Sequence, residues 1–169
     1  MALTSSPGLS PVFQIMSNRW FDGARLVVAV AVAVAITPLA PRSAAAQSRS
    51  FVVVVNASNA TSSVSRGDLS KLFTKKKRNW PGGAAAMPVD LATGNPVRDA
   101  FSVKVHGRST SAIGAYWQQQ IFSGREIPPP ERRDDDDVLA YVRENAGGVG
   151  YVAASAKLGN GVKALTVTD

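Results

Sequence analysis

Four consecutive valines constrain the fold of this 169-residue chain more than any other segment. Residues 51–56 read Phe-Val-Val-Val-Val-Asn, so five apolar positions follow one another with no polar residue between them. β-branched side chains favour strands, and an unbroken apolar run leaves no polar face to turn toward water. The run therefore predicts a strand that is buried on both faces, as in a parallel sheet.

Helix starts and further strands follow this segment in alternation. Four stretches have apolar positions at helical spacing. The caps Ser65, Asn95 and Ser109 precede three of them, and Asp134 to Asp137 start the fourth. Further short strands are predicted over residues 87–91, 149–152 and 162–167. This order predicts an α/β fold in a single compact domain, with a mostly parallel or mixed sheet.

The segment before the valine run resembles a secretory signal peptide. Arg19 and Arg25 precede an uncharged apolar stretch over residues 26–39, and the small residues Ala44 and Ala46 stand where a signal peptidase cleaves. The apolar stretch is shorter than the roughly 20 residues that span a bilayer. A signal peptide over residues 1–46 is therefore favoured over a membrane anchor.

Cleavage after Ala46 would release a domain of residues 47–169 into the periplasm, with no stable membrane insertion of the mature form. Met16 is an alternative start to Met1, because the basic segment begins just after it.

The chain is basic and contains no cysteine. It has 19 Lys and Arg against 12 Asp and Glu, for a net charge of +7, and most of this excess lies after residue 46. Such a charge favours anionic partners in general, such as phosphate-bearing solutes, nucleic acid or an anionic surface. The absence of cysteine excludes thiol catalysis and cysteine-ligated metals.

The junction between the strand at 87–91 and the next helix is the candidate anion site. A helix that starts after a strand directs unpaired N–H groups toward the edge of the sheet where ligands usually lie. Thr93 would add a hydroxyl, Gly94 would let the backbone approach closely, and Asn95 would cap the helix whose first turn carries Arg98. The alternative is a capped helix that binds only water.

An ordered set of motifs resembles the phosphate-transporter substrate-binding family, which has the type 2 periplasmic binding-protein fold. The motifs are Leu69-Ser-Lys-Leu72-Phe73, Asn79-Trp80-Pro-Gly82-Gly83, Met87-Pro-Val-Asp90, Gly94-x-x-x-x-Asp99-Ala-Phe101 and Gly147-Gly148-Val149-Gly150-Tyr151. The chain is similar to short, single-lobe-sized members of this family. The resemblance implies binding of a small oxyanion such as phosphate, in association with an ABC transporter permease or another envelope protein.

The junction departs from the family pattern, which typically reads Arg-x-Asp-x-Ser-Gly-Thr. Asp90 stands where the arginine would be, and Pro96 lacks a backbone N–H. The resemblance therefore implies the fold and, at most, weak phosphate binding. The alternative is a non-catalytic periplasmic interaction module that kept the fold and lost the ligand.

Two charged runs have a structural and a functional interpretation. Residues 75–78 with Trp80 could form a nucleic-acid patch or an envelope-surface patch, but a solvated helix end with core-packed Trp80 and Phe73 is favoured. Residues 134–137 are four consecutive aspartates, which diverge from one another, whereas calcium loops alternate their ligands. We therefore expect a helix start here, with no metal and no nucleic-acid partner.

The only histidine, His106, precedes Gly107 at the predicted end of a helix. No Gly-x-Ser-x-Gly pattern occurs in the chain, and a histidine at a helix end usually serves as a cap. The sequence predicts a protein that is not an enzyme and needs no cofactor.

Overall fold

The computed structural model describes residues 50–169. The predicted signal peptide, its cleavage after Ala46 and the alternative start at Met16 lie outside these residues. Across the described part of the chain, no helix is long and apolar enough to cross a membrane.

Strand β1 (Phe51–Asn56) is the central strand of a five-stranded sheet with the order β2-β7-β1-β6-β3. The other strands are β2 (Ser63–Ser65), β7 (Val162–Thr168), β6 (Gly148–Ala153) and β3 (Met87–Pro88). β1 runs antiparallel to both β6 and β7, whereas the outer pairs β2–β7 and β3–β6 are parallel. The sheet is therefore mixed, and the fold is α/β as predicted.

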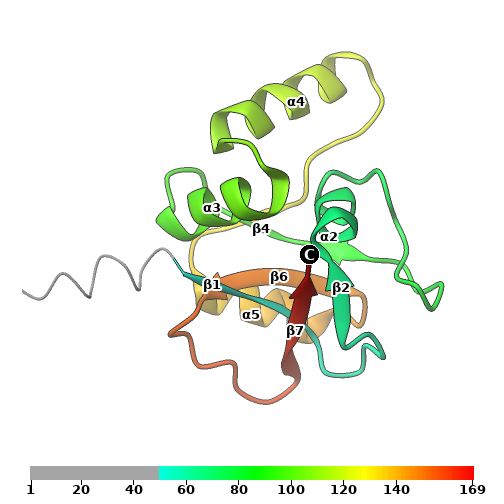
Figure 1. Ribbon diagram of the computed structural model, residues 1–169, viewed down its shortest axis with the longest axis vertical. Helices are drawn as coiled ribbons and strands as arrows, with labels where there is room; N and C mark the ends of the chain where they lie inside the picture. The colour runs from blue at the N-terminus through cyan, green and yellow to red at the C-terminus, as the bar shows by residue number, and fades with distance from the viewer. Residues whose placement is uncertain (1–49) are drawn as a thin grey trace, which may run out of the picture. The chain divides into compact units, whose positions relative to one another are not determined.

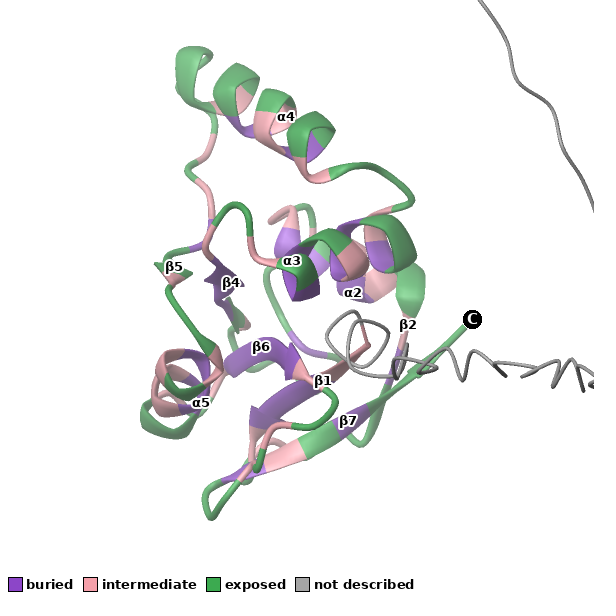
Figure 2. Cartoon of the chain, turned by 90° about the vertical axis from the view of Figure 1, so that its left-hand side faces the viewer, coloured by how far each residue is buried: buried purple, intermediate pink, exposed green. Residues whose placement is uncertain are grey.

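Helices on both faces explain why three successive valines of β1, Val53 to Val55, are no more than 2% exposed. Helix α5 (Asp135–Glu144) packs on one face of β1 and β6. On the other face of the sheet, helix α3 (Pro96–Phe101) packs against β1 and β6, and helix α2 (Arg66–Phe73) against β2 and β7 (Figures 1 and 2). Burial on both faces is confirmed, but it comes from this helical cover and not from parallel neighbours.

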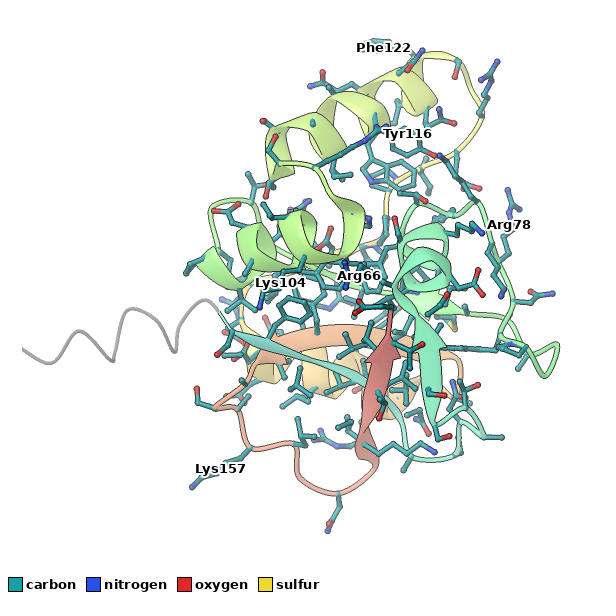
Figure 3. All side chains as sticks on the ribbon, in the orientation of Figure 1. Arg66, Arg78, Lys104, Tyr116, Phe122 and Lys157 are labelled. Atoms are coloured by element: carbon teal, nitrogen blue, oxygen red, sulfur yellow. The ribbon has the colours of Figure 1, made fainter. Side chains whose placement is uncertain are left out.

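The three predicted caps are confirmed, and so is the helix start at Asp134. Ser65 accepts a hydrogen bond from the backbone of α2, Asn95 from α3, and Asp134 from α5. α3 continues as a π-helical turn η1 (Ser102–His106), which ends at Gly107 with a φ of 64°. Ser109 caps α4 (Thr110–Phe122), whose Tyr116 hydroxyl reaches Thr74, while Phe122 lies at its far end (Figure 3).

The predicted strand over residues 87–91 is divided between two sheets. β3 ends at Pro88, and β4 (Asp90–Leu91) pairs in parallel with β5 (Glu131–Arg132) in a separate two-stranded sheet. The backbone N–H of Val89 still donates to Val149, whereas that of Asp90 donates to Pro130. The chain thus changes its hydrogen-bonding partner between Val89 and Asp90, which brings β4 to the start of α3.

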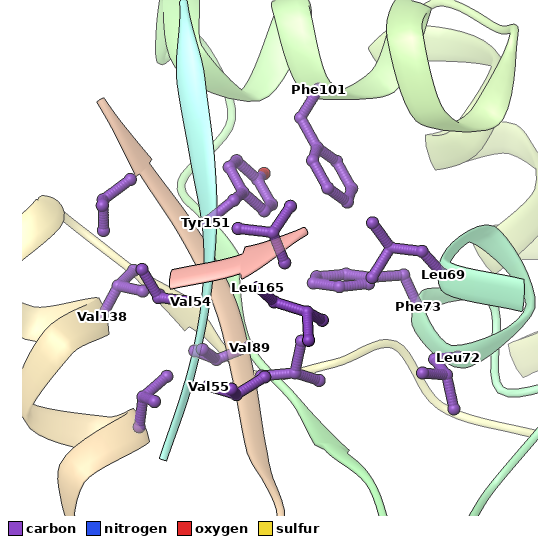
Figure 4. Packing of buried hydrophobic residues seen from close by; sticks show 14 of the residues in the cluster. Val54, Val55, Leu69, Leu72, Phe73, Val89, Phe101, Val138, Tyr151 and Leu165 are labelled. Atoms are coloured by element: carbon purple, nitrogen blue, oxygen red, sulfur yellow. The ribbon is translucent and has the colours of Figure 1, made fainter. Parts of the chain in front are cut away.

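Aromatic side chains fill the space between the sheet and α2 and α3 (Figure 4). The ring of Phe101 stacks on Tyr151 at 3.8 Å, and Phe73 lies 4.7 Å from Phe101. Phe73 and Trp80 are 2% and 3% exposed, which confirms that both belong to the core.

The glycines of the Gly147–Tyr151 motif are required by close packing. A Cβ atom on Gly150 would lie 2.6 Å from Val138 of α5, and one on Gly148 would lie 2.9 Å from the backbone of Val142. A Cβ atom on Gly147 would collide with the carbonyl of Ala85. The motif lets β6 lie directly against α5.

Candidate functional site

The predicted junction forms an exposed loop between β4 and α3. Thr93 and Gly94 are exposed, and Gly94 has a φ of 89°, which favours glycine. Asn95 is half-buried, and its Oδ1 accepts a hydrogen bond from the backbone N–H of Val97 at 2.9 Å. In the described part of the chain, the N–H groups of Thr93 and Gly94 donate to no other group, so two backbone donors remain open to solvent.

Arg98 belongs to the interior of the domain, where it is only 6% exposed. One terminal nitrogen donates to the carbonyl of Leu91 at 2.7 Å, to Thr93 Oγ1 at 3.1 Å and to Glu131 at 2.5 Å. The other lies 3.2 Å from Asp90. Burial lowers and the two carboxylates raise the pKa of Arg98, with a net upward shift, so the guanidinium stays charged.

Asp90 also faces inward, toward Arg98 and Tyr151. Its Oδ1 accepts hydrogen bonds from the Tyr151 hydroxyl and from the backbone N–H of Leu91. Burial raises the pKa of Asp90, while Arg98 and Tyr151 counteract this shift. Burial and the neighbouring Asp90 raise the pKa of Tyr151. Asp90 is thus compensated within the protein and does not face the solvent side of the junction.

The structure therefore brings Thr93 and Arg98 into contact but separates their roles. Thr93, Gly94 and Asn95 form the loop surface, and Arg98 links α3 to β4 and β5 beneath it. Sequence reasoning missed the Arg98 network because its partners Glu131 and Tyr151 are distant in the chain. The only local indication of this network was Asp90, which stands where the family pattern has an arginine.

A cavity of about 480 Å³ adjoins the junction at Asn95, and most of the charged residues that line it are acidic. Asp134, Asp135 and Asp136 line it together with a single cation, Lys157. Negative charges near a binding loop repel an anion and weaken its binding. The backbone donors of the junction thus favour binding of an oxyanion, whereas the aspartates around the junction disfavour it.

His106 lies at the end of η1 in a contact that the sequence pattern did not indicate. Its Nδ1 is 2.9 Å from the hydroxyl of Ser70 on α2, and its ring packs edge-on against Phe73 and Phe101. Burial, with smaller contributions from Arg108 and Arg98, lowers the pKa of His106 to about 4. The imidazole is therefore neutral at neutral pH.

This buried histidine predicts a loss of stability in acid. Because an unfolded histidine has a pKa near 6.5, the unfolded state takes up the proton first, and stability falls as the pH drops from about 6.5 to 4. We expect His106 to contribute a loss of about 2–3 kcal/mol across this window. Urea unfolding at several pH values measures it.

The control is His106→Asn, which retains a side-chain acceptor for Ser70 but does not titrate. Carboxylates also titrate in this window, so the informative quantity is the difference in slope between the two proteins. Equal slopes of stability against pH would show that His106 is not buried as described.

The basic run over residues 75–78 is largely paired. Lys75 and Arg78 contact Glu126 at 3.6 and 2.5 Å, and Lys77 contacts Asp68 at 3.0 Å. Trp80 is buried, and its Nε1 donates to the carbonyl of Gly147 at 3.3 Å. Trp80 is therefore unavailable for stacking on a base.

The aspartate run starts α5, as predicted. Asp134 accepts a hydrogen bond from the backbone N–H of Asp137 at 2.9 Å, and Asp135 accepts one from Ala153 at 3.1 Å. Within residues 50–169, no group of three or more histidine, aspartate or glutamate side chains is placed to hold a metal ion.

No protein-family model matches the chain, and none of the curated proteins does. Its fold, however, is similar to that of several solved structures. One is described as a phosphate ABC transporter substrate-binding protein with bound phosphate from Clostridium perfringens, at a TM-score of 0.56 and 18% identity. Another is an ABC-type phosphate transport receptor from Vibrio cholerae, at a TM-score of 0.55 and 16% identity. A third is a possible phosphate binding protein from Planctomyces limnophilus, at a TM-score of 0.51 and 15% identity.

These similarities establish a periplasmic-binding-protein-like fold. They cover 70%, 70% and 71% of this chain but only 44%, 46% and 42% of the three structures. The chain thus spans less than half the length of each protein that it resembles.

Proposed function

From this fold, we propose that the chain is an exported, non-enzymatic solute-binding protein that binds a small oxyanion such as phosphate weakly in the periplasm. In this proposal it acts in association with an ABC-type transport system, with a permease or another envelope protein as its partner. The observation that supports the proposal is the similarity of fold to structures described as phosphate-binding or phosphate-transport proteins.

The proposed contacts are the hydroxyl of Thr93 and the backbone N–H groups of Thr93 and Gly94, with Asn95 beside them; the N–H of Asn95 itself donates to the carbonyl of Ala92 at 3.2 Å. The N–H groups of Thr93 and Gly94 are open to solvent, and the charged Arg98 lies 3.1 Å from Thr93 Oγ1. Arg98 contributes its charge from beneath the loop and holds Thr93 in place; Asp90 and Glu131 offset that charge.

Weak affinity follows from the missing donors. A charge-assisted hydrogen bond contributes roughly 1.5–3 kcal/mol. Asp90 replaces the arginine of the family pattern, and Pro96 lacks an N–H. Two lost contacts amount to about 3–6 kcal/mol, or two to four powers of ten in affinity. We therefore expect a millimolar dissociation constant for phosphate.

Titration of the ¹⁵N-labelled protein with sodium phosphate tests the proposal. Amide shifts should cluster at Thr93–Asn95 with a millimolar midpoint. Asn95→Asp keeps the helix cap, because aspartate caps as well as asparagine, but adds a negative charge, so it should weaken binding.

The matched control is Asn160→Asp, which adds the same charge at an exposed position near Arg143, toward the other end of α5 from Asp134. It should leave the titration unchanged. An absence of shifts at Thr93–Asn95 well above millimolar phosphate would refute this site.

A second candidate function, a protein-interaction module, is favoured by exposed apolar side chains at the end of α4 and in the segment just after it. Phe122 is 89% exposed, Ile127 66% and Ile121 50%. Figure 3 shows Phe122 pointing away from the rest of the domain. If phosphate fails to bind, an interaction through this end of α4 becomes the better proposal, and Phe122→Ser should weaken it without unfolding the domain.

A further inference from the structure

A pocket of about 400 Å³ between α2, η1 and α4 has a basic lining. It lies away from the Thr93–Asn95 loop and shares no residue with it. Four cations line it: Arg66 and Lys71 on α2, Lys76 beyond the end of α2, and Arg108 after η1. No acidic residue is among the described residues that line it.

Two of these four cations keep an uncompensated charge. Arg66 pairs with Asp169, and Lys71 lies 3.4 Å from Asp68. Lys76, in contrast, lies over the ring of Tyr116 at 5.4 Å. The guanidinium of Arg108 has no partner among residues 50–169. A concave surface with unpaired charges of one sign attracts ions of the other.

The remaining lining combines neutral polar and apolar groups. The Ser70 hydroxyl lies beside His106, which is neutral at neutral pH, so Ser70 offers a hydroxyl without adding charge. Ile113 and the ring of Tyr116 supply an apolar wall (Figure 3 shows Arg66 on α2 and Tyr116 on α4). Ligand pockets typically combine such apolar walls with a few polar groups and enclose roughly 300–1,000 Å³.

The comparison with the cavity beside Asn95 shows that this lining is specific to the pocket. That cavity is of similar size but has three aspartates and one lysine in its lining. The two cavities therefore have linings of opposite charge, although they belong to the same basic chain.

We propose that the pocket between α2, η1 and α4 binds a small soluble phosphate monoester, with Arg108 and Lys76 contacting the phosphate group. The organic part of the ligand lies against Ile113 and Tyr116. A monoester contacts both the cations and the apolar wall of the pocket, whereas inorganic phosphate contacts only the cations. This site is independent of the Thr93–Asn95 loop.

NMR titration of the full chain with glycerol 3-phosphate tests this site, with inorganic phosphate and glycerol as comparison ligands. Shifts should cluster at Ser70, His106 and Arg108, at lower concentrations for the ester than for inorganic phosphate, and glycerol should cause none. Arg108→Gln and Lys76→Gln should each weaken ester binding about tenfold or more. Both residues are exposed, so neither variant should change the melting temperature.

The matched control is Arg125→Gln, which removes an exposed guanidinium outside the pocket. It should leave ester binding unchanged. If Arg125→Gln weakened ester binding as much as Arg108→Gln, the effect would come from net charge alone, and the proposed site would be wrong. Equal binding of inorganic phosphate would overturn the monoester class. Shifts only at Thr93–Asn95 would support the proposed function and refute this pocket, whereas shifts only at the pocket would do the reverse.

Discussion

Replacement of Arg98 by methionine should lower the free energy of unfolding by about 3–5 kcal/mol. Methionine fills much of the volume of the arginine stem, so the loss is mainly electrostatic. Asp90 would remain buried beside Tyr151 with no cation, and the carbonyl of Leu91 would lose its donor. Removal of one partner of a buried ion pair is costly because the other charge stays desolvated. Chemical denaturation measures the change.

Two further variants separate this effect from a loss of packing. Adding Asp90→Asn to Arg98→Met removes the stranded charge and keeps an acceptor for Tyr151, so the double variant should be more stable than Arg98→Met alone. Arg133→Met breaks an exposed pair with Asp137 and should cost about 1 kcal/mol or less. If Arg98→Met cost no more than Arg133→Met, the buried network would be wrong.

Phe73→Ala should also destabilise the domain, by about 3–5 kcal/mol. Phe73 is 2% exposed, and its ring lies 4.7 Å from Phe101 and 5.8 Å from Tyr151. It therefore joins α2 to α3 and to the central sheet, and its truncation would leave a cavity among all three. Thermal unfolding measures the effect, because a loss of this size lowers the melting temperature by more than ten degrees.

The control for this variant is Phe122→Ala. Phe122 is the same residue type on a helix but is 89% exposed, so its truncation should leave stability within about 0.5 kcal/mol of the original. An unchanged melting temperature in Phe73→Ala would contradict the packing of α2 on the sheet.

The starts of the helices and part of the core, including Phe73 and Trp80, were predictable from the sequence alone. Ser65, Asn95 and Asp134 cap helices through atoms two or three residues away, so the local pattern contains the whole interaction. The apolar spacing around Phe73 likewise determines which side of α2 is buried. The sequence located the Thr93–Asn95 loop for the same reason, because it lies between a strand and a cap.

Contacts between distant segments were decided only by the tertiary structure. The valines of β1 require burial, but valine side chains pack equally well beside parallel or antiparallel neighbours, so the direction of β6 and β7 was not predictable. The change of partner between Val89 and Asp90 depends on Pro130. The orientation of Arg98 depends on Glu131, and the pocket at His106 depends on Ser70, 36 residues earlier. Each of these features depends on which distant polar groups pair by hydrogen bonds or charge when the chain folds, and a local sequence pattern does not contain that information.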